Sequence, residues 1–365
     1  MFATRLGSLN ALEQSSRCRF WNKFLKGPMP SADTLGRVAD GLEAEECRDL
    51  LCHFYGQLRS NKAFDDRLGG MIALVVDGHE QCASYRRVCP GCLVREIKVG
   101  ETTKVQYYHR YVAASLVSRN LHLFIDLEPI LPGEDEVAAA LRLIERVHAS
   151  LPRAYDVVLA DSLYARADFF KAVLSKPNKH VLTVFKQEGR HLMQDALAVF
   201  EQLEPETVYA EPFRQGIAWS AEDFTSWESL ERPIRVVKFE ETRQVRRQLT
   251  KQYVEEKTEW TWVTSLPETC MGIDEIVLLG RKRWAIENEG FNEAVNKWHM
   301  DHVYRHAPNA MLVLLLLAML VAGLIEVFYR RDLKPAARAR VSLLHVCRMI
   351  AAELHSPAPL ARGPT

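Results

Sequence analysis

The sequence carries no net charge, because 47 lysine and arginine residues balance 47 aspartate and glutamate residues. A protein that binds a polyanion through its overall charge needs a basic surface, so the composition argues against binding of that kind. The charges are unevenly spread, however. Residues 232–251 and 281–283 are basic, whereas residues 42–46 and 128–136 are acidic. A phosphate-rich partner would therefore have to meet a local basic face.

The eight cysteines lack the regular spacing of a disulfide framework. The first residues, MFATRLGSLNALEQ, lack the charged-then-apolar pattern of a signal peptide. We therefore expect reduced thiols and a cytoplasmic protein. Cys89 and Cys92 form a CxxC pair, which supplies half of a tetrahedral zinc site. Three interpretations stay open: a structural Zn²⁺ held by two or three of Cys82, Cys89 and Cys92 with a histidine, a redox pair, or plain thiols in a turn.

The chain also lacks internal repeats and low-complexity segments. Its apolar run at 311–325, MLVLLLLAMLVAGLI, has 15 residues, whereas a membrane-spanning helix needs about 20. We predict a buried core helix and no membrane contact, with a membrane anchor through 310–328 as the alternative. The 365 residues, 48% hydrophobic and 26% charged, are typical of a globular protein with two or three subdomains.

Hydrophobic periodicity predicts a mixed α/β order. Residues 1–68 are helical, and strands follow at 71–77, 111–117 and 121–127. A helix over 137–148, a strand at 157–160, a helix at 168–174 and a strand at 181–185 come next. Alternation then predicts a β-rich segment over 204–265, which contains Trp219, Trp227, Trp260 and Trp262. These tryptophans are interpreted as core residues or as platforms for an unpaired base.

Helical spacing resumes at Ile276 and runs toward Trp298. His299, His302 and His306 continue this spacing, which could indicate a metal site, although one solvated face of the helix is the preferred interpretation. Residues 335–365 are predicted to form a helix and then a loose tail.

Three carboxylates stand in distinctive contexts. Asp77 ends the apolar run of MIALVVDGHE, Asp161 ends that of YDVVLADSLYA, and Glu287 lies in RKRWAIENEGFNEAVNKWH. An aspartate after an apolar run is often only a turn residue. Three carboxylates brought together would instead suit two Mg²⁺ ions, which activate water and stabilise a leaving oxygen in phosphoryl displacement. Glu287 is preferred to Glu289 because it shares a helical face with Arg283.

Together with these carboxylates, several segments of the chain resemble the DDE transposases of bacterial insertion sequences. The segments are DGHE (77–80), YYHRYVAA (107–114), ADSLYA (160–165), VFKQE (184–188), RWAIENEGFN (283–292) and WHMDH (298–302). The resemblance extends from about Ser31 to Lys334. It implies an RNase H-like mixed sheet with flanking helices, a β-rich insertion before the catalytic glutamate helix and a helical N-terminal region. The implied core has two parts, 69–203 and 266–334, separated by the insertion at 204–265. Residues 1–68 precede the core as a possible DNA-end-binding region, and residues 335–365 follow it as the tail.

The resemblance also implies a function. Asp77, Asp161 and Glu287 would hold two Mg²⁺ ions, for which Mn²⁺ would substitute, and Arg283, Lys297 and Lys186 would contact DNA. The reaction would be cleavage at the terminal inverted repeats of an insertion sequence, followed by transfer of the cut strands into target DNA. The enzyme would act as a homodimer associated with the nucleoid. This chain departs from the usual glutamate-helix signature, because Gly280 and Ala294 stand at the Tyr and Lys positions. The alternative is therefore a domesticated or decayed relative that binds DNA without cleaving it.

Overall fold

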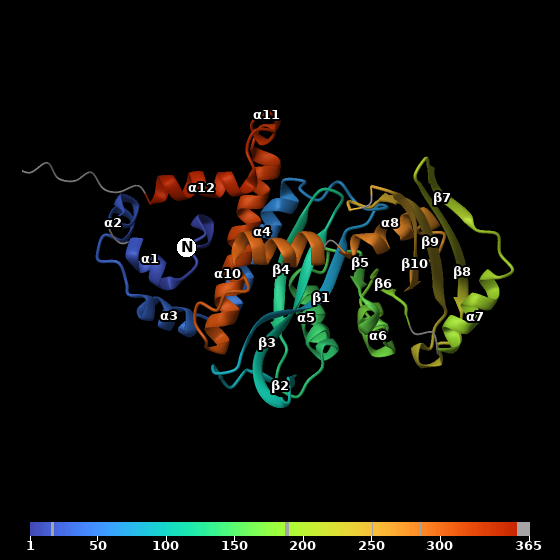
Figure 1. Cartoon of the computed structure of the whole chain (residues 1–365), viewed down its shortest axis with the longest axis horizontal. Coiled ribbons are helices and arrows are strands. Elements are labelled where there is room, and N and C mark those ends of the chain that lie inside the picture. The colour runs from blue at the N-terminus through green and yellow to red at the C-terminus, as the bar shows by residue number, and fades with distance from the viewer. Residues whose placement is uncertain (16–17, 187–189, 250, 285, 356–365) are drawn as a thin grey trace, which may run out of the picture.

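The computed structural model describes residues 1–15, 18–186, 190–249, 251–284 and 286–355, without the side chains of residues 19, 22, 288 and 289 (Figure 1). Its centre is one ten-stranded mixed sheet in the order β2-β3-β1-β5-β6-β10-β9-β8-β7, with β4 beside β3. Helices cover the sheet and form a separate layer at one end. The predicted α/β fold class, an RNase H-like sheet with an inserted β segment, is confirmed.

Five strands form the first part of the sheet. Strands β1 (Ala73–Ser84), β3 (Thr102–Val117) and β4 (His122–Pro129) are antiparallel, whereas β5 (Val157–Ala160) and β6 (His180–Val184) run parallel to β1. Helices α5 (Glu136–Ser150) and α6 (Ala167–Leu174) make the connections. Residues 73–76 and 157–160 are fully buried, because strands covered on both faces require continuous apolar runs.

The sequence did not predict β2 (Leu93–Val99) or the first half of β3, which together form a long hairpin. Most of its side chains are exposed, including those of Val94 and Val99. Ladder hydrogen bonds between the two strands, rather than burial, hold this ribbon together, so it leaves little hydrophobic pattern in the sequence.

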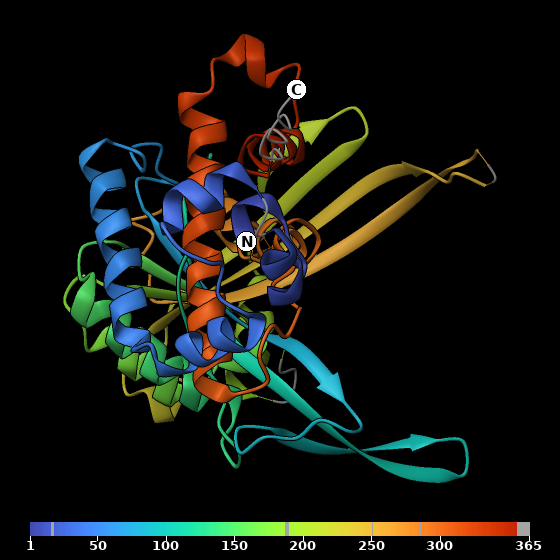
Figure 2. The ribbon, with the colours of Figure 1, turned by 90° about the vertical axis from the view of Figure 1, so that its left-hand side faces the viewer.

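The β-rich segment contains β7 (Glu206–Glu211), β8 (Arg214–Phe224), β9 (Ile234–Arg246) and β10 (Tyr253–Thr264), preceded by α7 (His191–Phe200). Strand β10 pairs with β6 and so extends the central sheet. Trp227 and Trp262 are buried and Trp260 stacks on Phe239, which supports their interpretation as core residues. Figure 2 shows the β2–β3 and β9–β10 hairpins projecting from the same side of the molecule.

The N-terminal helices are α1 (Leu9–Gln14), α2 (Arg19–Leu25), α3 (Ala32–Gly41) and α4 (Ala44–Ser60), after a short η1 (Phe2–Thr4). Helix α4 packs on β4, where Arg48 donates to the buried carboxylate of Asp126 at 3.0 Å. The C-terminal α12 (Leu343–Leu354) packs against η1 and α2, so the two ends of the described chain lie side by side (Figure 1).

The apolar helix α10 (Pro308–Val327) has 20 residues and continues through the π-helix η6 (Phe328–Asp332) to α11 (Pro335–Arg338). It is longer than the 15-residue run suggests, because it begins at a proline in its first turn and continues past Ile325. By length and composition it could cross a membrane, yet more than half of its most apolar window is buried. It packs against α3, α4 and β4 as a core helix.

Helix α8 (Ile273–Lys282) is attached to the insertion through a buried carboxylate, that of Glu241, which is 2% exposed. Glu241 Oε1 accepts hydrogen bonds from Arg214 Nε at 2.6 Å and Arg281 Nη1 at 2.8 Å, and from the Tyr209 hydroxyl. Burial by itself raises the pKa of Glu241, but the Tyr209, Arg281 and Arg214 hydrogen bonds outweigh it and lower the pKa to about 2.

A second packing constraint on α8 is Gly280, the position where the resemblance leads one to expect tyrosine. A Cβ atom there would lie 2.5 Å from Trp262 Cε2. Trp262 is 1% exposed and occupies the space beside the helix. The residue at position 280 therefore faces the interior, so a tyrosine here could not reach DNA.

The Glu241→Ala substitution should lower the free energy of unfolding by about 1–3 kcal/mol, because it leaves three donors without their shared acceptor. A carboxylate with a lowered pKa stabilises the protein fully above about pH 4.5, and this contribution is lost as the pH falls toward 2. Urea unfolding should therefore show a difference between wild type and variant that shrinks below pH 4.5. The exposed Glu259→Ala is the control, and an equal effect of both substitutions would contradict the assignment.

The Gly280→Ala substitution should destabilise the protein by about 1–3 kcal/mol, because overpacking against Trp262 outweighs the gain in helix propensity. Gly56→Ala, in α4 with nothing within 4 Å of the added methyl, is the matched control and should be neutral or stabilising by up to about 1 kcal/mol. Thermal unfolding of both variants provides the measurement. A stabilised Gly280→Ala protein would show that Trp262 does not fill this space.

Candidate active site

Asp77 lies on β1 at the point where its fully buried segment ends. The strand continues to Ser84, so the aspartate is inside a strand and not at its end. Its side chain is almost buried, and its Oδ1 accepts a hydrogen bond from the Gly78 N–H at 2.9 Å.

Asp161 follows β5 directly and begins the short 3₁₀-helix η3 (Ser162–Tyr164). Its Oδ1 caps this turn by accepting from the Leu163 N–H at 2.8 Å. The parallel pairing of β1 with β5 joins Ala73 to Val157 and Val75 to Leu159. The same register, carried two residues further, places Asp161 beside Asp77, because neighbouring strands are about 4.8 Å apart.

Glu287 lies in a π-helix, η5 (Ile286–Phe291), between α8 and α9 (Asn292–Trp298). The helical spacing predicted from Ile276 toward Trp298 is therefore interrupted here by a π-helical segment. π-Helical turns are rare and are frequent at functional sites. The alternative residue, Glu289, has a side chain that lies outside the described residues.

Arg283 joins the first and third carboxylates. Its Nη1 lies 3.4 Å from Asp77 Oδ2 and 3.0 Å from Glu287 Oε1. These two oxygens are thus no farther apart than the sum of those distances. The guanidinium is 5% exposed, and its Nε has no hydrogen-bond partner among the described residues. The predicted pairing of Arg283 with Glu287 is present, and Asp77 is a second partner.

The electrostatics of this group favour a cation. Burial raises the pKa of Asp77 to about 7, Arg283 opposes that rise, and the charges of Asp161 and Glu287 add to it. One guanidinium thus contacts two of the three carboxylates, Asp77 and Glu287, while the third, Asp161, lies beside Asp77, which leaves excess negative charge in a partly buried place. Oxygen donors of this kind fit Mg²⁺ or Mn²⁺.

A fourth carboxylate, that of Glu136 at the start of α5, lies next to this group and was missed in the sequence. It accepts hydrogen bonds from Tyr164 Oη at 2.8 Å and from Arg110 Nη2 at 2.5 Å. A Cβ atom at Gly78 would lie 2.3 Å from Glu136 Cδ, so the glycine after Asp77 lets the Glu136 carboxylate lie against β1. Arg110, Glu136 and Tyr164 lie in the sequence segments YYHRYVAA, LEPILPGEDEVAAALRLIERV (127–147) and ADSLYA. Their spacing along the chain, however, does not assign them a role.

The two lysines predicted to contact DNA, Lys297 and Lys186, differ from each other in their surroundings. Lys297 forms an ion pair at 2.5 Å with Glu293, one turn earlier on α9. Lys186 is exposed and directly follows Phe185, beyond the end of β6. Ala294, at the usual lysine position, is 2% exposed. The π-helix interrupts the α-helical register, so a spacing of seven residues from Glu287 no longer leads to the exposed face.

Trp284 is 44% exposed and packs under the Arg283 guanidinium.

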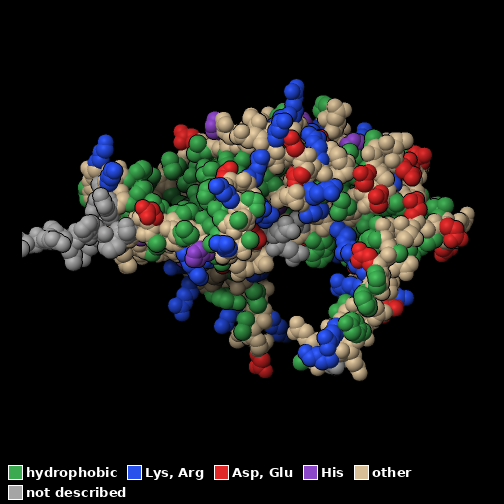
Figure 3. Space-filling model, turned by 90° about the horizontal axis from the view of Figure 1, so that it is seen from above, with side chains coloured by type: hydrophobic (Ala, Val, Ile, Leu, Met, Phe, Trp, Pro, Cys, Tyr) green, Lys and Arg blue, Asp and Glu red, His purple; other side chains and the backbone are tan. Residues whose placement is uncertain are grey.

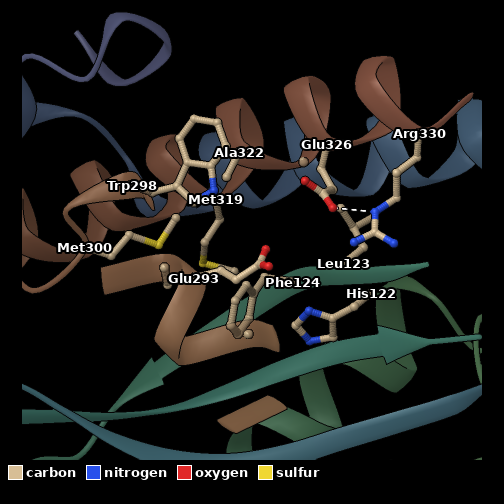
Figure 4. A pocket seen from close by; sticks show the side chains of 13 residues that line it. His122, Leu123, Phe124, Glu293, Trp298, Met300, Met319, Ala322, Glu326 and Arg330 are labelled. Atoms are coloured by element: carbon tan, nitrogen blue, oxygen red, sulfur yellow. Dashed lines mark hydrogen bonds and ion pairs between the residues drawn. The ribbon is translucent and has the colours of Figure 1, made fainter. Parts of the chain in front are cut away.

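A cavity behind the glutamate segment shows how that segment is supported (Figure 4). It lies between β4, α9 and α10, and its lining includes His122, Phe124, Trp298 and Met319. A Cβ atom at Gly290 would lie 2.7 Å from His122 Cε1, so this glycine lets η5 approach β4. On the other side, His79 of β1 stacks on Phe291 at 4.5 Å. The cavity belongs to the packing of η5 and not to the carboxylate group.

The thiols gather elsewhere. Cys89 and Cys92 meet His109 of β3 and His306, and one ligand atom from each lies within 4.8 Å of every other. Cys82 is not in this group, which corrects its prediction as a ligand: it lies on β1, paired in register with His109. The interpretation of His306 as part of a solvated helix face is also wrong, because α9 ends at Trp298 and residues 299–307 form a connecting segment.

Comparison with known families agrees with this geometry. The family described as transposase DDE domain matches residues 95–324, more than half of the chain. The matched region begins after Asp77 and includes Asp161 and Glu287. No curated protein matches the chain. The family match, together with three carboxylates on an RNase H-like sheet, shows that the chain belongs to the transposase DDE-domain family.

Proposed function

We propose that this transposase cleaves DNA at the ends of an insertion sequence and joins them to target DNA, in a Mg²⁺-dependent reaction in the cytoplasm. The observation that carries the proposal is the arrangement of Asp77, Asp161 and Glu287 around Arg283. Members of this family act on DNA, so the substrate class follows from the family. We propose the ends of the element as the DNA that is cleaved, Mg²⁺ as the metal, and strand transfer as the step that follows cleavage.

Asp77, Asp161 and Glu287 would hold two Mg²⁺ ions, and Mn²⁺ would substitute. When bound, the ions supply an activated water, and later an activated 3′-hydroxyl, and stabilise the departing oxygen. Arg283 holds Asp77 and Glu287 near each other against their mutual repulsion. The Leu163 N–H fixes the Asp161 carboxylate, and the Gly78 N–H fixes that of Asp77. Direct attack by water or a hydroxyl on the phosphodiester needs no protein nucleophile.

The DNA surface is proposed to lie between the two projecting hairpins. Figure 3 shows a hollow between two projections, with lysine and arginine side chains around it. The β9–β10 hairpin carries exposed cations near its tip, namely Arg243, Arg246, Arg247, Lys251 and Lys257. Some are already neutralised, because Glu256 pairs with Arg243 and Arg247. These local cations could contact DNA phosphates although the whole chain has no net charge.

We propose further phosphate contacts from Lys186 and Arg283, and also from Lys297 once it exchanges Glu293 for phosphate. Because an element has two ends, two active sites are needed, and we expect a homodimer on the DNA. The alternative, a relative that binds DNA without cleaving it, draws on the absent tyrosine and lysine. In this chain Ala294 is buried and position 280 faces Trp262, and a cleavage assay distinguishes the two functions.

The Asp161→Asn substitution should reduce strand cleavage by several orders of magnitude while leaving DNA binding nearly unchanged. The amide keeps the size of the side chain but removes the anionic oxygen that a hard cation requires. The measurement uses labelled DNA that carries the end of the element, with Mg²⁺ or Mn²⁺, and scores nicking and binding separately.

Asp195→Asn, an identical change on the exposed part of α7, is the matched control and should cleave like wild type. Wild-type protein that binds the ends but never nicks them with either metal would support the non-cleaving relative. Equal cleavage by wild type and Asp161→Asn would remove Asp161 from the site.

A double substitution, Arg246→Ala with Arg247→Ala, should weaken binding to duplex DNA of any sequence. The slope of log K against log salt should fall by about 2, since each phosphate contact contributes about 0.9. The same loss of two charges at Lys334 and Arg340, which are exposed on either side of α11, is the control. Equal slopes for the two double variants would place the DNA away from the β9–β10 hairpin.

A further inference from the structure

A cluster of two thiols and two imidazoles lies apart from the carboxylate site and takes no part in the proposed chemistry. The Sγ atoms of Cys89 and Cys92 are 3.7 Å apart, and His109 Nε2 lies 3.3 Å from each of them. His306 Nε2 lies 3.3 Å from His109 Nε2 and 3.7 Å from Cys92 Sγ. Four potential ligand atoms from three segments of the chain thus face a common centre.

Five of the six separations are close to the edges of a tetrahedron around a metal ion, and the sixth, between Cys89 Sγ and the His306 imidazole, is within 4.8 Å. Zinc bonds of about 2.3 Å to sulfur and about 2.0–2.1 Å to nitrogen imply edges of about 3.8 Å between sulfurs, about 3.5 Å between sulfur and nitrogen, and about 3.3 Å between nitrogens. The observed sulfur–sulfur and nitrogen–nitrogen distances agree with these edges to about 0.1 Å. The sulfur–nitrogen distances that involve Cys92 and His109 agree to about 0.2 Å.

Hydrogen bonding within the cluster does not account for the arrangement. An imidazole nitrogen carries at most one proton, yet His109 Nε2 faces two sulfur atoms and a second imidazole nitrogen. Two thiol protons and one proton on each Nε2 are at most four protons for five close contacts, so at least one pair of atoms has no proton of its own between them. A shared cation at the centre would turn this repulsion into four attractive contacts.

We propose that Cys89, Cys92, His109 and His306 bind one structural Zn²⁺ ion. Two sulfur and two nitrogen donors in a tetrahedral arrangement are typical of zinc. With four protein ligands the ion has no open position for a substrate or water, so its role is to hold the structure together.

The backbone around the two cysteines is shaped for this purpose. The Cys92 N–H donates to the Cys89 carbonyl at 3.1 Å, and the Cys89 N–H donates to Cys92 Sγ at 3.2 Å. A Cβ atom at Gly91 would lie 3.1 Å from Pro308 Cγ, so this tight turn rests on the first turn of α10.

The ion would connect segments that the sheet alone does not connect. Cys89 and Cys92 precede β2, His109 is on β3, and His306, 197 residues later, lies between α9 and α10. Arg110, the residue after His109, donates to Glu136 beside the carboxylate site. The zinc would thus fix the base of the β2–β3 hairpin against the chain that leaves the glutamate segment.

The test is metal analysis of the full-length protein purified without chelators. Mass spectrometry of the metal content should find about one zinc per chain. Replacement of zinc by Co²⁺ should produce the visible absorption of a tetrahedral ion with two thiolates. His306→Ala and Cys92→Ser should each reduce the zinc content at least fivefold, and chelation should lower the melting temperature of the wild type.

Three further variants distinguish a zinc ion at these four ligands from a metal-free cluster or from zinc bound at another cysteine. His306→Cys keeps a ligand, so it should retain zinc and shift the Co²⁺ spectrum toward three thiolates even if His306→Ala fails to fold. Cys82→Ser and the exposed Cys270→Ser should retain zinc. Protein without zinc, a disulfide between Cys89 and Cys92, or zinc lost on Cys82→Ser but kept in His306→Ala would each overturn the assignment. Any of these results leaves the proposed cleavage reaction intact.

Discussion

The buried guanidinium of Arg283 is the interaction on which the site depends. Carboxylates brought together in a partly buried place repel one another, and an unpaired buried charge is strongly destabilising. Arg283 contacts Asp77 on β1 and Glu287 on η5 with a single nitrogen, which ties the first strand of the sheet to a segment about two hundred residues later. One cation among three carboxylates still leaves a negative site, and this is the charge balance that divalent metal binding requires.

The position of Arg283 and Glu287 depends in turn on how α8 is seated. Glu241 holds Arg281 from the insertion side, and Trp262 fills the space that Gly280 leaves open. The inserted strands therefore serve as the support of the helix that leads into the site, besides carrying the basic β9–β10 hairpin. The π-helix η5 then changes the register of the following residues, so that Ala294, seven residues after Glu287, is buried.

The outer parts of the molecule follow a different principle. The β2–β3 and β9–β10 hairpins extend away from the core and present cations to solvent, so they gain little from hydrophobic burial. The Cys89, Cys92, His109 and His306 cluster lies at the base of the first hairpin, where apolar packing is thin. A metal ion there would supply the cross-link that burial supplies elsewhere.

The sequence by itself determined the order of the core elements, because continuous apolar runs such as 73–76 and 157–160 have few alternatives as buried strands, and it singled out Asp77, Asp161 and Glu287 from their contexts. Only the tertiary structure decided the partners that come from distant segments. Glu136 beside Gly78, Trp262 beside Gly280, and His306 beside Cys92 are each joined by packing across more than 15 residues, which no local periodicity encodes. The β2–β3 hairpin and the π-helix at Glu287 were missed for a related reason: ladder pairing, tertiary packing and charge hold them, and none of these leaves a regular hydrophobic pattern along the chain.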